Sequence, residues 1–327
     1  MPRMPERALH LLTVVTPMLD EESTVHTFHA RLAGALDGLP WELVVGDDGS
    51  TDATPRLLDE LASRDGRVRA IHLSRRFGHQ TALTAGLDHA RGDAVVMLDG
   101  DLQDPPELIL TMLDRWREGA DVVYAARTHR EGESRFKLGT ARGFYRVLGR
   151  LSDVPLQSDS GDFRLLDRRA LDALQSMRER NRYLRGMTVW VGFTQTAVPY
   201  RREVRHAGAT KYPLRRMLRF ALDAIASFSY VPLQVASLMG FLFAALAFMA
   251  IPVALTFKLL GAFVPGTTTT IIAVLLLGGI QLMAIGLIGE YVGRIYDEVK
   301  GRPLYVVRSR VNVAEPAADE PERLPVP

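Results

Sequence analysis

Cysteine is absent from the 327-residue chain, which excludes disulfide bonds and thiolate metal sites and suits a cytosolic location. A charge excess of either sign is also lacking: 40 Lys and Arg are balanced by 38 Asp and Glu, and the net charge of +2 argues against nucleic acid as a partner. No G-x-G-x-x-G or Walker A sequence occurs, which excludes ordinary dinucleotide-binding and P-loop proteins. The apolar run at residues 9–15 is short and interrupted, so we expect no signal peptide.

Short β-rich runs alternate with helical patterns over the first 127 residues. The expected strands cover residues 11–17, 41–45, 68–73, 93–98 and 121–125. Short links join each strand to the helix that follows. This alternation predicts an α/β fold with a parallel, doubly wound sheet. A further short strand is expected after residue 158, and residues 190–200 are β-like.

Three carboxylates follow the buried strand that ends at Leu98, namely Asp99, Asp101 and Asp104. Side chains two apart on an extended segment point the same way, so Asp99 and Asp101 can bind one ion. Their hard oxygen atoms suit Mg²⁺ or Mn²⁺, which often shares a substrate phosphate. An isolated D-x-D sequence is more often an acidic surface loop than a metal site. The residues at the other strand ends therefore distinguish between these two interpretations.

Other strand ends carry polar residues at the same edge of the predicted sheet. They are the turn at residues 17–22, the pair Asp47 and Asp48, and Arg127. Ligands of α/β proteins bind beyond the carboxyl ends of the strands. A nucleotide needs a carboxylate for its base or ribose and cations for its diphosphate, and both are present. Asp48 could also cap the helix after its strand, and Asp162 could orient Arg164 rather than act in chemistry.

The second half of the chain indicates a membrane. Residues 213–230 are amphipathic and basic, as in a helix at a membrane surface. Uncharged stretches at about 231–257 and 269–290 are each long enough to span a bilayer, and a short turn joins them. Basic residues lie outside this hairpin, so both ends are expected in the cytoplasm, on a multi-pass protein of the inner or plasma membrane. Short hairpins often associate, which makes a homo-oligomer compatible with the sequence.

These patterns divide the chain into four parts. They predict a cytoplasmic catalytic domain at 1–212, an interfacial helix at 213–230, a transmembrane hairpin at 231–293 and a cytoplasmic tail at 294–327. The tail is rich in Pro, Glu and Ala from residue 314 and is expected to be disordered.

An ordered set of short motifs resembles one known family. The motifs are T-V-V-T-P at 13–17, D-D-G-S-T-D at 47–52, L-S-R-R-F-G at 73–78, D-G-D-L-Q-D-P-P at 99–106, D-F-R at 162–164, R-Y-L-R-G at 182–186 and R-H-A-G-A-T-K-Y at 205–212. With the hairpin, they resemble the family 2 glycosyltransferases of GT-A fold, and among these the polyisoprenyl-phosphate glycosyltransferases. The resemblance covers roughly residues 9–310. Asp20 and Arg76 stand where the family usually has Asn, which leaves the donor open.

The resemblance implies roles for individual residues. Donor contacts are implied for Thr16, Pro17, Glu21, Asp48, Asp99, Arg127 and Lys211. Metal ligation is implied for Asp99, Asp101 and Gln103, with Mg²⁺ or Mn²⁺ as the ion. Catalytic roles are assigned to Asp101, Asp162 and Arg205. In addition, the basic loop at 128–137 lies well placed for a lipid phosphate, so Arg135 and Lys137 are expected to bind the acceptor.

The expected reaction is inverting transfer of one sugar from a nucleotide sugar to a polyisoprenyl phosphate at the cytoplasmic membrane face. UDP-glucose is the favoured donor; GDP-mannose and a UDP-amino-pentose remain alternatives. A processive polysaccharide synthase is a second alternative, although the Q-x-x-R-W motif is absent and only two spans are expected. A catalytically inactive membrane scaffold is a third, opposed by intact Asp99, Asp101 and Gln103.

Overall fold

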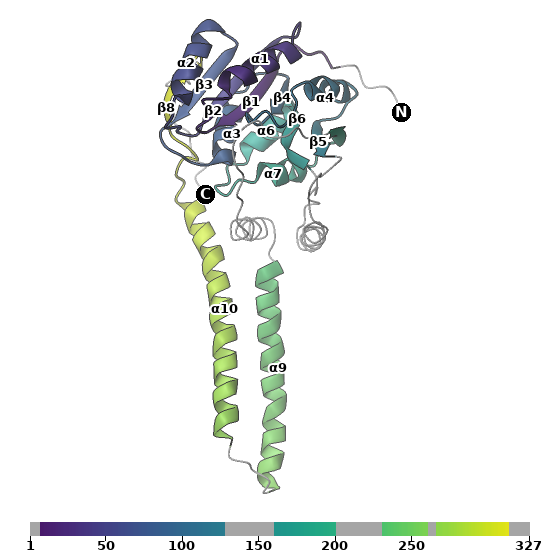
Figure 1. The fold of residues 1–327 in the computed structure, drawn as a ribbon. Helices are drawn as coiled ribbons and strands as arrows, with labels where there is room; N and C mark the ends of the chain where they lie inside the picture. The colour runs from purple at the N-terminus through teal and green to yellow at the C-terminus, as the bar shows by residue number, and fades with distance from the viewer. Residues whose placement is uncertain (1–6, 128–159, 201–230, 261–265, 314–327) are drawn as a thin grey trace. The chain divides into compact units, whose positions relative to one another are not determined.

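The computed structural model describes residues 7–127, 160–200, 231–260 and 266–313 of the chain (Figure 1). The chain divides into two compact units. Unit 1 contains an eight-stranded sheet with its helices, and the described residues 303–313 that follow the long helices also belong to it. Unit 2 contains two long helices. The predicted interfacial helix at 213–230 lies outside the described residues.

The sheet of unit 1 is mixed rather than purely parallel. Its spatial order is β7-β5-β6-β4-β1-β2-β3-β8. The strands are β1 (Leu12–Met18), β2 (Trp41–Asp47), β3 (Val68–Leu73), β4 (Ala94–Met97), β5 (Val122–Arg127), β6 (Ser160–Asp167), β7 (Gln195–Tyr200) and β8 (Val307–Val311). Strands β1 to β4 pair in parallel, as predicted, and so do β5 and β7. In contrast, β6 runs antiparallel between β4 and β5, and β8 runs antiparallel to β3.

Helices cover both faces of this sheet. The helices of unit 1 are α1 (Val25–Ala35), α2 (Thr54–Arg64), α3 (His79–Asp88), α4 (Leu108–Arg117), α6 (Arg168–Ser176) and α7 (Leu184–Trp190). Buried side chains of α1, α2 and α4, including Phe28, Leu58 and Trp116, form one core with the inward-facing strand residues. Helices α3 and α6 pack on β1, β2 and β4 and on each other. Ligand sites of α/β proteins lie beyond the carboxyl ends of the parallel strands, which here are the ends of β1, β2 and β4.

Two element boundaries differ from the sequence expectation. Helix α1 begins at Val25 rather than at the acids of residues 20–22, because the Asp20 carboxylate accepts a hydrogen bond from the Thr51 amide at 2.8 Å. The expected β-like segment at 190–200 becomes a strand only from Gln195, since helix α7 occupies the residues up to Trp190.

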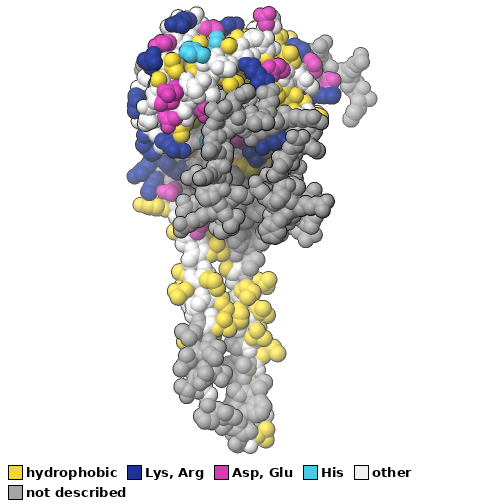
Figure 2. All heavy atoms as spheres, viewed as in Figure 1, with side chains coloured by type: hydrophobic (Ala, Val, Ile, Leu, Met, Phe, Trp, Pro, Cys, Tyr) yellow, Lys and Arg dark blue, Asp and Glu magenta, His cyan; other side chains and the backbone are white. Residues whose placement is uncertain are grey.

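Unit 2 contains α9 (Val231–Leu259) and α10 (Thr267–Val299), at the positions of the two predicted spans. Figure 2 shows hydrophobic side chains along the described surface of these helices. In the part of the chain that the structure describes, one stretch, Leu276–Val299, is long and apolar enough to cross a membrane. That stretch begins and ends later than the predicted second span, and a crossing by α9 remains a prediction.

The segment after α10 is not simply a tail. Helix α10 continues to Val299, and residues 307–311 then form β8 at the outer edge of the sheet. The sequence analysis missed this strand because its two arginines, Arg308 and Arg310, interrupt the apolar pattern of an edge strand. Residues from 314 onward lie outside the described residues.

Candidate active site

The loop that follows β4 carries the predicted metal-binding carboxylates. Strand β4 is held against β1, because the Leu98 amide donates to the Val15 carbonyl at 3.0 Å. The Leu98 carbonyl in turn accepts from the Thr16 hydroxyl at 2.8 Å. Thr16, a predicted donor contact, is therefore fully buried and fixes the point from which Asp99 projects. Pro17, another predicted contact, lies inside β1 opposite Gly46.

Asp99 lies in an acidic neighbourhood. Surrounding protein desolvates its carboxylate and raises its pKa to about 6, and the nearby charges of Asp162, Asp104 and Asp101 act in the same direction. His79 opposes this shift, since its Nε2 atom lies 3.6 Å from Asp99 Oδ1 and 3.4 Å from Asp162 Oδ2. The pKa of His79 is raised: burial alone would lower it, but these carboxylates outweigh burial. The sequence analysis missed His79, whose only signal was its place at the end of the loop after β3.

Asp162, at the start of β6, is the centre of a hydrogen-bond network. Its Oδ2 atom accepts from Gln80 Nε2 at 3.2 Å, and its Oδ1 atom pairs with the Arg185 guanidinium at 3.2 Å. Burial acts to raise the pKa of Asp162, but His79, Arg185 and Arg164 outweigh it and hold the pKa well below its ordinary value. Gln80 also accepts from the Leu184 amide at 3.0 Å, which ties helix α7 to the site. Such a network positions groups rather than leaving a carboxylate ready to take a proton.

Arg164 is buried beneath this network. Its guanidinium donates to the carbonyls of Gly161 and Arg185 at 3.2 and 3.3 Å and to the Thr188 hydroxyl. Burial lowers its pKa to about 10, so it remains a cation at neutral pH. The sequence analysis considered that Asp162 orients Arg164. In the structure Asp162 acts on Arg164 through its charge, whereas it forms an ion pair with Arg185, a residue of the separate R-Y-L-R-G motif.

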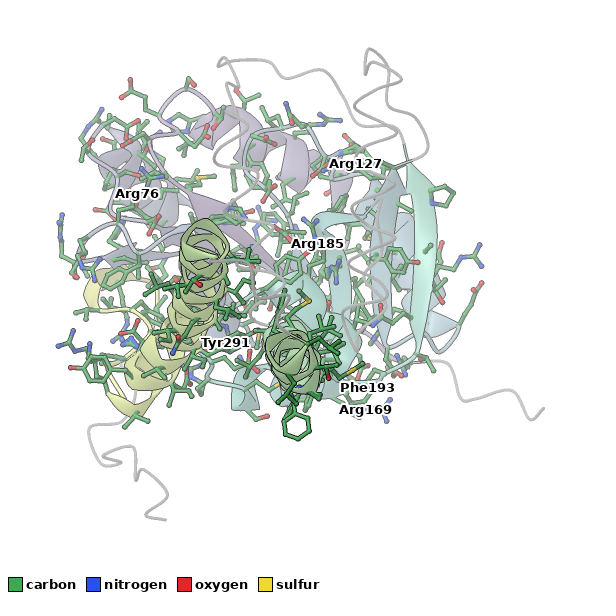
Figure 3. All side chains as sticks on the ribbon, turned by 90° about the horizontal axis from the view of Figure 1, so that it is seen from below. Arg76, Arg127, Arg169, Arg185, Phe193 and Tyr291 are labelled. Carbon is green, nitrogen blue, oxygen red and sulfur yellow. The ribbon has the colours of Figure 1, made fainter. Side chains whose placement is uncertain are left out.

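A second row of polar groups lies beside the acidic loop. The Asp104 carboxylate accepts a hydrogen bond from the Tyr200 hydroxyl, and the Arg127 Nε atom donates to the same hydroxyl at 3.3 Å. Burial and the Asp104 charge raise the pKa of Tyr200 to about 12. In Figure 3 the labelled side chains of Arg76, Arg127 and Arg185 come from three separate segments of unit 1. The predicted cation Arg127 is therefore at the sheet edge where the sequence analysis expected it.

Asp48 has a backbone role that the sequence did not indicate. Its buried carboxylate accepts from the amides of Phe77 and Gly78 at 2.7 and 2.9 Å. It does not cap α2, whose N-cap residue is Ala53. Gly78 has a φ of +110°, a conformation that favours glycine, so this loop can turn sharply towards the carboxylate. A role on the nucleotide base would add to this anchoring role.

Glu21 lies near the same edge. Its amide donates to the Thr54 hydroxyl at 2.9 Å, and its carboxylate accepts from the Thr24 hydroxyl at 3.1 Å. The predicted residues Arg135, Lys137, Arg205 and Lys211 lie outside the described residues, so their acceptor and donor roles remain predictions.

The donor set fits a divalent cation that a substrate also binds. Among the described residues, no three His, Asp or Glu side chains form a metal cluster by themselves. Asp99 and Asp101 nevertheless offer hard oxygen atoms, and the Asp101 carboxylate also accepts from the Gln103 amide at 3.1 Å, which bends the loop. Mg²⁺ usually keeps waters and takes one or two carboxylates together with substrate phosphates. Two carboxylates are therefore enough for such an ion.

Comparison with known proteins bears on this arrangement. The model of Glycosyl transferase family 2 matches residues 13–175, which include β1 to β6 and the acidic loop. The glycosyltransferase YkcC of Bacillus subtilis is 46% identical over 304 residues, covering 92% of this chain and 94% of that protein. The chain belongs to the family 2 glycosyltransferases. A glycosyltransferase of Synechocystis, sll0501, is 43% identical over 90% of this chain and 94% of its own length.

A bactoprenol glucosyl transferase of Shigella flexneri is 37% identical to this glycosyltransferase over 300 residues, which are 91% of this chain and 97% of that protein. These relatives place the chain among the polyisoprenyl-phosphate glycosyltransferases. Among solved structures, glucosyl-3-phosphoglycerate synthase from Mycobacterium tuberculosis is 22% identical, covers 66% of this chain and 76% of that one, and has a TM-score of 0.46. A structural similarity at this level does not assign a role to any residue of this chain.

Proposed function

We propose that this glycosyltransferase transfers a single glucose from UDP-glucose to a polyisoprenyl phosphate, with inversion at the sugar C1 atom. The observation that carries the proposal is the similarity to the bactoprenol glucosyl transferase, which extends over nearly the full length of both chains and so includes the helical unit as well as the sheet. The acidic edge of the sheet supports a nucleotide-sugar donor, because Asp99 and Asp101 can share a metal ion with a diphosphate.

The hydrogen bonds of Asp162 support a phosphate as the acceptor. A phosphate monoester is largely ionised at neutral pH, since its second pKa is near 6. Such a nucleophile needs no general base, and Asp162 is already engaged by Gln80 and Arg185. Catalysis can then rest on positioning and charge neutralisation. A metal ion held by Asp99, Asp101 and Gln103 would stabilise the departing nucleoside diphosphate.

The membership of β8 in the sheet supports a hairpin in the membrane. Strands β1 to β7 precede the long helices and β8 follows them, yet all pair in one sheet. The chain on both sides of α9 and α10 then lies in one compartment, which requires that any crossings of a bilayer between these strands are even in number. If the stretch Leu276–Val299 spans, α9 is the natural second span. The basic residues outside the hairpin favour the cytoplasm for the sheet.

A donor panel tests the proposal. The purified full-length protein is incubated with undecaprenyl phosphate, Mg²⁺ or Mn²⁺, and UDP-glucose, GDP-mannose or a UDP-amino-pentose in turn. We expect one hexose per lipid with UDP-glucose, detected by mass spectrometry, and loss of product in excess EDTA. Product from another donor alone would correct the sugar, and lipids carrying several sugars would indicate a polymerase. Absence of product with every donor would contradict the proposal.

A further inference from the structure

The strand that follows the long helices reaches the loop that leads into the acidic site. Strand β8 pairs with β3 through Ala70 with Val311, Ile71 with Arg310, His72 with Ser309, and Leu73 with Val307. The ladder steps from Ser309 to Val307, so Arg308 is an extra residue and forms a β-bulge. Bulges re-aim side chains and recur beside active sites. Here the bulge lies at the carboxyl end of β3, where ligand-binding loops begin.

Both backbone groups of Ser74 are held by this segment. The Ser74 amide donates to the Val306 carbonyl at 2.8 Å, and the Ser74 carbonyl accepts from the Arg308 guanidinium at 3.1 Å. Ser74 is the first residue after β3. The bulge therefore turns the Arg308 side chain back onto the point where β3 ends and the loop of residues 74–78 begins.

The same loop is held at its other end by groups of the candidate site. The Asp48 carboxylate accepts from the amides of Phe77 and Gly78, and His79 lies between Asp99 and Asp162. The loop is also closely packed against the turn after β2, since a Cβ atom on Gly49 would lie 2.6 Å from the Arg75 carbonyl carbon. A shift at Ser74 would therefore move the backbone that Asp48 and His79 contact.

Further contacts fix β8 on both sides of the bulge. Before it, the Tyr305 hydroxyl donates to Asp88 at the end of α3 at 2.8 Å. After it, the Asn312 side chain donates to the carbonyls of Ala62 and Val68 at 2.7 and 2.9 Å. Arg308 thus extends from a strand that is anchored at both ends, and its side chain is exposed, so replacing it removes one contact without opening the core.

We propose that Arg308 is a positioning residue for the donor site, acting through Ser74 on the loop of residues 74–78. This inference rests on the proposed function in one respect, namely that the loop of residues 74–78 borders the nucleotide of the sugar donor. It assigns to the segment after the membrane helices a part in sugar-donor binding, although no residue of that segment belongs to the predicted donor contacts.

Three variants of the full-length protein test this inference: Arg308→Ala, Arg308→Lys, and Arg64→Ala as a charge-matched control at the exposed end of α2. We measure UDP binding by calorimetry, the KM for each substrate, kcat and the thermal midpoint. We expect Arg308→Ala to raise the UDP Kd and the nucleotide-sugar KM by about three- to tenfold, which is the net range of one ordinary hydrogen bond, because Arg308 acts on the site only through Ser74. The lipid KM should stay unchanged, Arg308→Lys should recover most of the loss, and Arg64→Ala should match the wild type.

Other outcomes overturn the inference. Unchanged UDP binding in Arg308→Ala does so, as does a lower thermal midpoint without a change in nucleotide-sugar KM, which would show a purely structural contact. Equal losses in Arg308→Lys and Arg308→Ala also count against it. Failure of the proposed donor is seen separately, because the wild-type protein would then bind another nucleoside diphosphate in place of UDP, and the variants are compared with that nucleotide.

Discussion

His72 lies between two carboxylates, Asp47 at the end of β2 and Asp59 on α2, with nitrogen–oxygen distances of 2.8 and 3.0 Å. Burial alone would lower the pKa of His72, but these two hydrogen bonds outweigh burial and raise it. Burial would raise the pKa of Asp47, but His72 and Ser50 outweigh it and lower that pKa. The Ser50 amide donates to Asp47 at 3.0 Å, so this buried group supports the turn that also contains Asp48.

The raised pKa of His72 predicts how the free energy of unfolding depends on pH. The contribution of charged His72 is fully present below the ordinary histidine pKa of about 6.5 and is lost as pH rises through the raised folded-state value. The lowered pKa of Asp47 acts in the opposite sense, and its contribution is lost only as pH falls below the ordinary Asp range. We expect His72→Gln to lower the thermal midpoint more at pH 6 than at pH 9. The exposed His26 provides the control His26→Gln, and an equal loss at both pH values would contradict the charged state of His72.

Individual residues of the candidate site could be predicted where a charged side chain stands at the end of a predicted strand. Asp99, Asp101 and Arg127 follow strand ends, and the structure places them at one edge of the sheet. The roles of His79 and Gln80 were not predictable, because their partner Asp162 is about 80 residues away and belongs to β6. Neither did local sequence show that Asp48 would bind backbone amides of the loop after β3. Partnerships of this kind depend on strand order, which periodicity does not reveal.

Helix α3 lies unusually close to the sheet, and glycine makes this possible. A Cβ atom on Gly86 would lie 2.3 Å from the Cγ1 atom of the fully buried Val15. Likewise, a Cβ atom on Gly46 of β2 would lie 2.2 Å from the Ala82 carbonyl oxygen. Because α3 begins with His79 and Gln80, its distance from β1 and β2 sets where these side chains meet Asp162.

Gly86→Ala is expected to destabilise the protein by about 1–3 kcal/mol, the usual cost of overpacking a core. Gly34→Ala in α1 is the matched control, since nothing lies within 4 Å of the added methyl group. At that exposed position of the helix the change should stabilise the protein by roughly 0.5–1 kcal/mol. Thermal unfolding of both variants measures the difference, and a neutral Gly86→Ala would mean that α3 can move away from β1 at little cost.

The elements themselves show where sequence patterns suffice. The hydrophobic periodicity and the turn residues predicted β1 to β4 and the helices between them, because in these segments the pattern of apolar residues matches the side chains that the fold buries. The antiparallel direction of β6 was not predictable, because the side-chain pattern of a single strand is the same whichever way the strand runs. Strand β8 was missed since its pairing with β3 joins segments more than 230 residues apart.

For the whole molecule, the absence of cysteine allows a clean test of topology. Single cysteines are introduced by Ser23→Cys and Ser309→Cys in unit 1 and by Leu260→Cys after α9, all at exposed positions. In intact spheroplasts a membrane-impermeant maleimide should label only Leu260→Cys, because one sheet contains the strands before and after the helices. The other two should react only after permeabilisation. Labelling of Ser309→Cys but not of Ser23→Cys from outside would contradict the hairpin, and labelling of both but not of Leu260→Cys would reverse its orientation.

The place of β8 in the sheet also sets the order in which the enzyme is completed during translation. A ribosome makes β8 roughly 240 residues after β3, which at about 5–20 residues per second means a delay of about ten to fifty seconds. Throughout that interval the edge of β3 that pairs with β8 is open, and Ser74 lacks its partners Val306 and Arg308. Both long helices leave the ribosome in the same interval. A nascent chain therefore acquires the contacts of Ser74 with Val306 and Arg308 only after its membrane segments have been made.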